Sequence, residues 1–240
     1  MKTNDSKKLT LAWRLASLLI LPLAGHAQTT LSSGHTDIGI EYDELLNDWN
    51  MHVHDHVNDV EYAPATNALL FVKSDAHGYI PGGAQWSFLG TTGSEVWTLP
   101  SVQDPNLLFL GFGAEEVTSG LFVGDQFTIA LKGISGPGSL TIYDLDSFGN
   151  PVVWMNTRDG IDGFDSRLAP PGLHQDLNFA FSAPGDYTVF FEASGNSVLN
   201  GQTSSGDAAY LFHVQPVPEP GTLALASLGL AALAVFRKRK

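Results

Sequence analysis

The chain has 240 residues, with 12 Lys and Arg, 25 Asp and Glu, and no Cys. Outside residues 1–27 and 216–240 only four basic side chains remain against 23 acidic ones, a formal charge of −19. Such an acidic surface repels nucleic acid and attracts divalent cations, and a chain without Cys has neither disulfides nor thiolate ligands.

Residues 1–27 have the three parts of a secretory signal peptide. An apolar run, residues 15–23, follows a basic segment, and Gly25-His26-Ala27 offers small residues at the two positions that a signal peptidase inspects. The basic residues are Lys2, Lys7, Lys8 and Arg14. The sequence therefore predicts export through the Sec machinery and a mature domain that begins near Gln28.

The next segment predicts a hairpin with one apolar and one polar face. Residues 35–42 and 49–58 flank a polar turn, and both alternate between apolar and polar side chains. The apolar sets are Ile38, Ile40 and Tyr42 before the turn, and Trp49, Met51, Val53 and Val57 after it. Directly opposed residues of an antiparallel pair project to the same face. Burying both apolar sets therefore places His35, Asp37 and Glu41 on the same face as Asn50, His52, His54, His56 and Asn58.

That polar face predicts a divalent-metal site. Histidines at i and i+2 on a strand have Cα atoms about 6.7 Å apart, so that two imidazoles can reach one ion. A third His or a carboxylate from the paired strand completes a tetrahedral shell for Zn, and a more oxygen-rich shell suits Mn. His174 and Asp176 form another alternating pair that we expect nearby, whereas His77 and His213 are expected to be structural. The predicted ligands are His35, Asp37, His52, His54, His56 and His174. The alternative is a set of solvated polar residues on an exposed strand.

The body of the chain predicts an all-β domain over residues 28–215. Gly- and Pro-containing turns separate many short apolar or alternating runs, and no long 3.6-residue period occurs. The predicted strands are 68–73, 85–89, 95–99, 107–112, 126–131, 139–143, 152–155, 177–181, 187–193 and 209–214. We expect a single antiparallel β-sandwich of two packed sheets, Ig-like or jelly-roll-like.

A second, acidic constellation suggests Ca²⁺ only weakly. Oxygen-rich loops can hold this ion, but the segment lacks the Gly and terminal Glu of a helix–loop–helix calcium site. Asp and Asn also form turns without any ion. The residues concerned are Asp144, Asp146, Asn150, Asp159, Asp162 and Asp165.

The C-terminal segment 216–240 predicts a sorting tail. Pro218-Glu219-Pro220 precedes the uncharged apolar run 222–236, and the chain ends in Arg237-Lys238-Arg239-Lys240. Fifteen residues of helix span about 22 Å, short of the roughly 30 Å hydrocarbon core. A short transmembrane helix of this length suits a temporary stop in the inner membrane, with its basic end on the cytoplasmic side. An ordinary C-terminal membrane anchor is the alternative.

This tail resembles the tripartite signal of PEP-CTERM proteins. The resemblance implies a Gram-negative bacterium, handling by an exosortase-type transpeptidase, and a final location at the cell surface or outside the cell. It covers about the last 24 residues, with Pro218, Glu219 and Pro220 as the motif.

The body resembles the surface domain called choice-of-anchor M over roughly residues 31–214. The matching segments are Ser33-Gly34-His35-Thr36-Asp37-Ile38-Gly39, Trp49-Asn50-Met51-His52-Val53-His54-Asp55, Glu61-Tyr62-Ala63-Pro64, Leu107-Leu108-Phe109-Leu110-Gly111, Phe148-Gly149-Asn150-Pro151, Asn156-Thr157 with Asp159-Gly160, and Phe181-Ser182-Ala183-Pro184-Gly185. The resemblance implies metal handling beside a metal-uptake ABC transporter, with His35, His52, His54 and His174 as ligands. Asp176 departs from the family pattern, which has a second His there.

No motif predicts an enzyme. The chain has no Gly-x-Ser-x-Gly elbow, phosphate loop, Cys nucleophile or helical His-Glu-x-x-His. We expect either a surface-sorted metal-binding module or a structural or adhesive protein of the extracellular polysaccharide matrix. In the second case Trp86, Trp97 or Trp154 would stack on carbohydrate.

Overall fold

The computed structural model describes residues 28–218 and residue 221. The predicted signal peptide and C-terminal transmembrane helix lie outside the described residues. Within them the predicted all-β class is confirmed, because the only helices there are 3-10 turns of three residues. None of these helices is long and apolar enough to cross a membrane.

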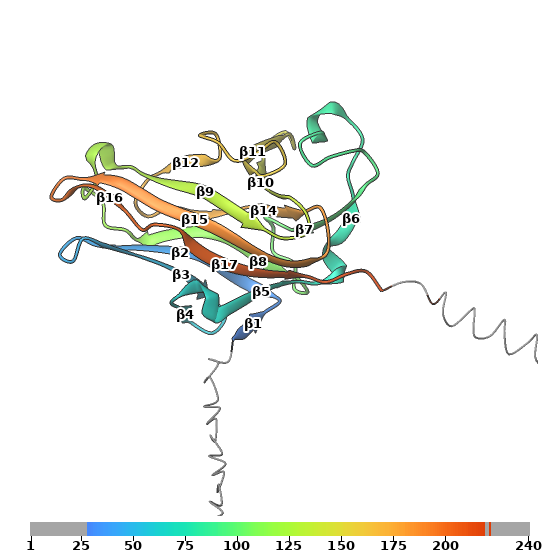
Figure 1. Cartoon of the computed structure of the whole chain (residues 1–240), viewed down its shortest axis with the longest axis horizontal. Helices are drawn as coiled ribbons and strands as arrows, with labels where there is room; N and C mark the ends of the chain where they lie inside the picture. Colours follow the sequence, from blue (N-terminus) through green and yellow to red (C-terminus); the bar gives the residue numbers. More distant parts are fainter. Residues whose placement is uncertain (1–27, 219–220, 222–240) are drawn as a thin grey trace, which may run out of the picture.

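The strands form three sheets, each named here after a central strand (Figure 1). The β15 sheet has the order β1 (Thr29–Leu31), β5 (Ala68–Val72), β17 (Ala208–Val214), β15 (Gly185–Ser197), β9 (Phe127–Ser135) and β12 (Ser166–Ala169), and β16 (Gly201–Ser204) also pairs with β15. The β14 sheet has the order β11 (Pro151–Asn156), β10 (Leu140–Leu145), β14 (Asn178–Phe181), β7 (Glu95–Leu99) and β6 (His77–Tyr79). The β2 sheet has the order β13 (His174–Asp176), β8 (Leu108–Glu116), β2 (Gly34–Asp43), β3 (Asp48–Asp55) and β4 (Val60–Tyr62).

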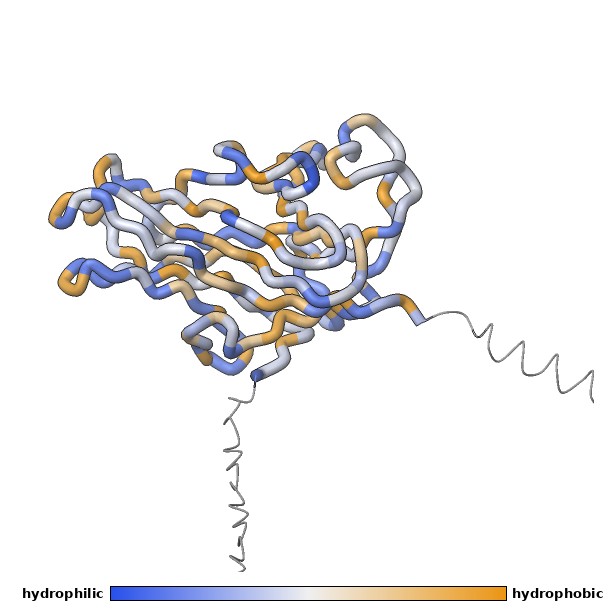
Figure 2. Tube along the Cα trace, viewed as in Figure 1, coloured by the Kyte–Doolittle hydropathy of each residue, from blue (hydrophilic) through white to orange (hydrophobic). Residues whose placement is uncertain are grey.

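One hydrophobic core joins the three sheets. Phe112 of β8 lies 5.4 Å from Phe191 of β15 and 6.2 Å from Phe179 of β14, measured between ring centroids. All three rings are fully buried. The alternation of apolar and polar residues along the strands, visible in Figure 2, turns one side chain in two toward this core. The polar side of the β2 sheet is therefore held on a packed scaffold.

The prediction of two antiparallel sheets is wrong in two respects. There are three sheets, and three strand pairs are parallel: β1 with β5, β5 with β17, and β2 with β8. A parallel pair needs a long connection between its strands. Turn residues and local alternation can predict hairpins, but they do not show which strands pair when the strands are distant along the chain.

The strand predictions are otherwise confirmed, with one exception. Residues 85–89 form helical turns beginning with the 3-10 helix Ala84–Trp86, in which Trp86 donates to the carbonyl of Gly83 and Ser87 to that of Ala84. The alternation of Trp86 and Phe88 with polar residues resembles that of a strand. In the structure both side chains pack against a small second core that includes Tyr143. β8 and β15 also run further than predicted.

Candidate metal centre

The first hairpin has the predicted register. In the β2–β3 pair Asp37 lies opposite His54, Gly39 opposite His52, and Glu41 opposite Asn50. His56 N donates to the His35 carbonyl at 3.2 Å, which continues the pairing beyond the end of β3. The expectation that the polar residues of the two strands share one face is confirmed.

The end of this hairpin differs from the prediction at Val57. The strand stops at Asp55, whose carboxylate accepts hydrogen bonds from the backbone N–H groups of Val57 and Asn58. Val57 is therefore in a turn and is 65% exposed instead of facing the core. The Asp55 side chain holds the turn, which no alternation pattern predicts.

A trough of glycines crosses the polar side of the β2 sheet. On β8, Gly111 lies beside Asp37 and Gly113 beside Gly39. A Cβ atom at Gly111 would lie 2.7 Å from Asp37 Oδ1, and one at Gly113 would lie 2.9 Å from Asp37 Oδ2. The missing side chains thus create the space that the Asp37 carboxylate fills, which is why Asp37 is only 1% exposed.

The outer strand β13 completes this trough. It pairs with β8 so that His174 lies opposite Gly113 and Asp176 opposite Gly111. Because Gly111 and Gly113 have no side chains, the side chains of His174 and Asp176 can extend over β8 toward β2. The adjoining groove has a volume of about 170 Å³ and is lined by Asp37, Gly39, Ile40, His52, His54, His56, Gly113, Glu115 and Glu116.

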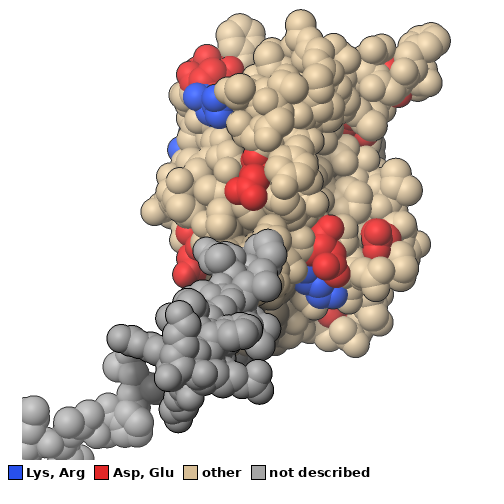
Figure 3. Space-filling view, turned by 90° about the vertical axis from the view of Figure 1, so that its right-hand side faces the viewer, with Lys and Arg blue, Asp and Glu red and all other residues tan. Residues whose placement is uncertain are grey.

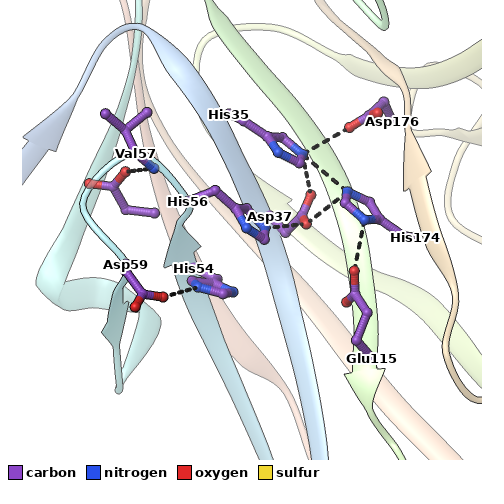
Figure 4. A network of polar contacts seen from close by, with 10 residues as sticks. His35, Asp37, His54, His56, Val57, Asp59, Glu115, His174 and Asp176 are labelled. Carbon is purple, nitrogen blue, oxygen red and sulfur yellow. Dashed lines mark hydrogen bonds and ion pairs between the residues drawn. The ribbon is translucent and has the colours of Figure 1, made fainter.

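Four side chains converge at one point of the trough (Figure 4). Asp37 Oδ2 lies 2.8 Å from His56 Nε2 and 3.3 Å from His174 Nε2, and Asp37 Oδ1 lies 3.5 Å from His35 Nε2. The Nε2 atoms of His35 and His174 are 3.1 Å apart. One ligand atom from each of His35, Asp37, His56 and His174 lies within 4.8 Å of all the others. We call these residues the four-residue cluster.

The spacing of the four-residue cluster fits a tetrahedral ion. Metal–ligand bonds of about 2.1 Å place neighbouring ligand atoms of a tetrahedron about 3.4 Å apart. With Asp37 Oδ2 as the ligand atom, its separations from His56 Nε2 and His174 Nε2 are 2.8 and 3.3 Å, and the Nε2 atoms of His35 and His174 are 3.1 Å apart, so these three separations lie slightly below this value. Three imidazoles with one carboxylate are also a donor set that Zn²⁺ takes. The cluster could therefore hold a divalent ion with little rearrangement.

Two buried carboxylate oxygens at this point accept no hydrogen bond. They are Asp37 Oδ1 and Asp176 Oδ1, although His35 Nε2 lies 3.5 and 3.2 Å from them. Burial raises the pKa of Asp176, and the nearby His35 opposes this shift. His174 Nδ1 contacts Glu115 Oε1 at 2.8 Å, an outer contact of the kind that orients a ligating imidazole. Both oxygens therefore have lone pairs that could coordinate a cation.

The predicted ligands His52 and His54 lie beside the four-residue cluster and outside it. The His54 ring is 4.0 Å from that of His56 and 6.3 Å from that of His52, and its Nε2 lies 3.8 Å from the exposed carboxylate of Asp59. His52 is 1% exposed, and its Nδ1 has no hydrogen-bond partner. Burial lowers the pKa of His52. His52 instead groups with Glu61 and Glu116.

Three acidic residues of the site were missed from the sequence: Glu61, Glu115 and Glu116. The predicted strand 107–112 stopped before the glutamates of β8, and the register of β2 with β8 shifts between Gly39 and Glu41. This irregularity lets the two consecutive glutamates face the same groove. The glycines at 111 and 113 inside a strand were the available signal.

Other candidate residues lie elsewhere. His77 contacts Glu95 and His213 contacts Asp186, each as a simple pair. In the acidic constellation, Asp146 accepts N–H groups of Phe148 and Asn150, as expected of a turn. None of its acids belongs to either of the two potential metal-binding groups within residues 28–218. Those groups are the four-residue cluster and the His52 group.

The Trp residues predicted as carbohydrate platforms lie in or against the core. Trp97 is 2% exposed. Trp86 and Trp154 are partly buried against apolar clusters, and Arg167 covers the Trp154 ring.

Comparison with known proteins identifies the tail. Residues 216–240 match the family model of the PEP-CTERM protein-sorting motif. This motif implies an exported protein that an exosortase-type enzyme sorts to the cell envelope or surface. No curated protein matches the chain, and neither does any solved structure.

Proposed function

We propose that the protein is a surface-sorted β-sandwich module that binds a divalent metal ion, Zn²⁺ or Mn²⁺, through His35, Asp37, His56 and His174. Its β15 sheet forms one layer, and the β2 and β14 sheets form the other. The signal peptide, the Sec machinery and a C-terminal transmembrane helix belong to the same proposal, as does membership of the choice-of-anchor M family. The role is binding, without catalysis.

One observation carries the metal proposal. Four ligand atoms from three separate chain segments lie within 4.8 Å of one another, around a carboxylate that is 1% exposed. A buried carboxylate is costly unless a positive group or hydrogen bonds compensate it. Among the described residues the only ion pair of Lys or Arg joins Lys132 to Glu192, far along the chain from this point. The three imidazoles that contact Asp37 are positive only when protonated, whereas a bound dication would compensate its charge with all three imidazoles neutral.

The experiment is Zn²⁺ titration of the full chain, purified in detergent, by calorimetry. The double variant His35→Ala/His174→Ala should lose Zn²⁺ affinity by at least about 100-fold, since it removes two ligands of one ion. The matched control is His77→Ala/His213→Ala, which removes two histidines that each contact a single carboxylate. This control should bind Zn²⁺ like the native protein.

Two results would contradict the proposal. Either the native protein does not bind Zn²⁺ or Mn²⁺ at neutral pH, or the two double variants lose affinity equally. The structural or adhesive role in the polysaccharide matrix would then be the remaining hypothesis for the exported module.

A further inference from the structure

The His52 group lies in the same groove as the four-residue cluster, on the other side of His54. It consists of the His52 imidazole and the carboxylates of Glu61 and Glu116, with one ligand atom from each within 4.8 Å of the others. β3 supplies the imidazole, and the two carboxylates come from its neighbour β4 and from β8 beyond β2. Three strands of the β2 sheet therefore direct donor atoms to a second point.

His52 has the burial and the free ring nitrogen expected of a metal ligand. The residue is 1% exposed, and the ring nitrogen Nδ1 makes no hydrogen bond. A buried polar nitrogen left without a hydrogen bond is unfavourable. The ring is held over Gly39, where any Cβ atom would overlap it. A glycine at position 39 therefore provides the space that the His52 imidazole occupies.

The two glutamates bring negative charge that the described protein groups do not neutralise. Glu61 and Glu116 are both exposed, and the negative charges of Glu41 and Glu115 lie close enough to Glu116 to repel its carboxylate as well. Among the described residues, none of the ion pairs of Lys or Arg involves these carboxylates. Residues 28–215 contain only four Lys and Arg side chains, and few are seen on the end of the molecule that Figure 3 shows.

We propose that His52, Glu61 and Glu116 form a second divalent-cation site, separate from the four-residue cluster. Its two carboxylates and one imidazole make it richer in oxygen than the four-residue cluster, and this donor set favours Mn²⁺ relative to Zn²⁺. The proposal does not depend on the first site. Consecutive residues of β8 divide between the two sites, because Glu115 contacts His174 and Glu116 belongs to the His52 group.

The test is a Mn²⁺ titration of the full chain in detergent, with free Mn²⁺ measured by electron paramagnetic resonance. The variant Glu61→Gln/Glu116→Gln should weaken Mn²⁺ binding at least about tenfold and leave Zn²⁺ binding by the four-residue cluster unchanged. The variant His35→Ala/His174→Ala should weaken Zn²⁺ binding by the four-residue cluster and leave Mn²⁺ binding by the His52 group unchanged. Glu95→Gln removes a carboxylate from a His–Glu pair of the β14 sheet and is the matched control.

A second measurement locates the ion directly. In protein with ¹⁵N-labelled histidine, substoichiometric Mn²⁺ should broaden the His52 signal before those of His35 and His174. The proposal is overturned if the native protein does not bind Mn²⁺, if the glutamate variant binds it like the native protein, or if His35 and His174 broaden first. Loss of Zn²⁺ binding in the histidine variant alone bears on the four-residue cluster and leaves this site standing.

Discussion

Replacing Asp37 by Asn tests whether the four-residue cluster is a metal site or only a hydrogen-bonded network. The substitution keeps the shape of a side chain that is 1% exposed and removes its negative charge. In the native protein three imidazole nitrogens lie 2.8, 3.3 and 3.5 Å from this carboxylate. If Asp37 is a metal ligand, the variant should be less stable to unfolding than the native protein only when metal is present.

The size of the effect follows from linkage. At a Zn²⁺ concentration about 100 times its Kd, binding stabilises the native fold by about 2.7 kcal/mol. An affinity loss of about 100-fold leaves roughly 0.4 kcal/mol of this at the same concentration. The variant should therefore lose about 2.3 kcal/mol, or about 5–9 °C in Tm for a domain of this size.

Without metal the same substitution should leave Tm unchanged or raise it. It removes a buried charge that no Lys or Arg of the described residues compensates. The assay is thermal unfolding of native protein and variant in Zn²⁺ and in chelator. A variant that melts several degrees lower in chelator, with no further loss in Zn²⁺, would refute the reasoning and make Asp37 a structural hydrogen-bond acceptor.

Two further predictions concern the trough and the protein surface. Gly111→Ala places a Cβ 2.7 Å from Asp37 Oδ1 and 2.7 Å from a backbone oxygen of β13. It should lower the free energy of unfolding in urea by about 1–3 kcal/mol and weaken Zn²⁺ binding. The control Gly78→Ala, with no atom within 4 Å of the new Cβ, should have neither effect. Hydrogen bonding to Lys132 lowers the pKa of Glu192 below 4.5, so this pair stabilises the fold above about pH 4.5 and loses its contribution as pH falls through the lowered pKa. Glu192→Gln should thus cost about 0.2–1 kcal/mol at pH 7 and progressively less as the pH falls below 4.5, and a cost that does not change with pH would contradict this account.

Much of the first hairpin could be predicted because its information is local. Alternation in residues 35–42 and 49–56 fixes which side chains share a face, and burial of one face fixes the register. The hairpin alone accounts for His35, Asp37 and His56. His174 could be named as a candidate from its own alternation with Asp176, although its position could not be derived.

The remainder depends on pairings that no local pattern contains. β2 pairs in parallel with β8, and β8 in turn carries β13, so that His174 meets His35 across 139 residues of chain. The same pairing brings Glu116 to His52. Sequence reasoning placed His52 in one site with His35, because sharing a face was taken as sharing an ion. In the structure the potential ligands on this face fall into two separate groups.

The long-range origin of the four-residue cluster has a consequence for folding. Its ligands come from β2, from the turn after β3, and from β13, and these segments are adjacent only when the β2 sheet is complete. A preformed site is then absent from the unfolded chain, so the free energy of ion binding adds to the stability of the whole sheet. An ion here would link the edge strand β13 to the central strand β2 across the glycines of β8, where no side chains provide packing. The trough that makes room for the ion is thus the part of the sheet that gains most from its presence.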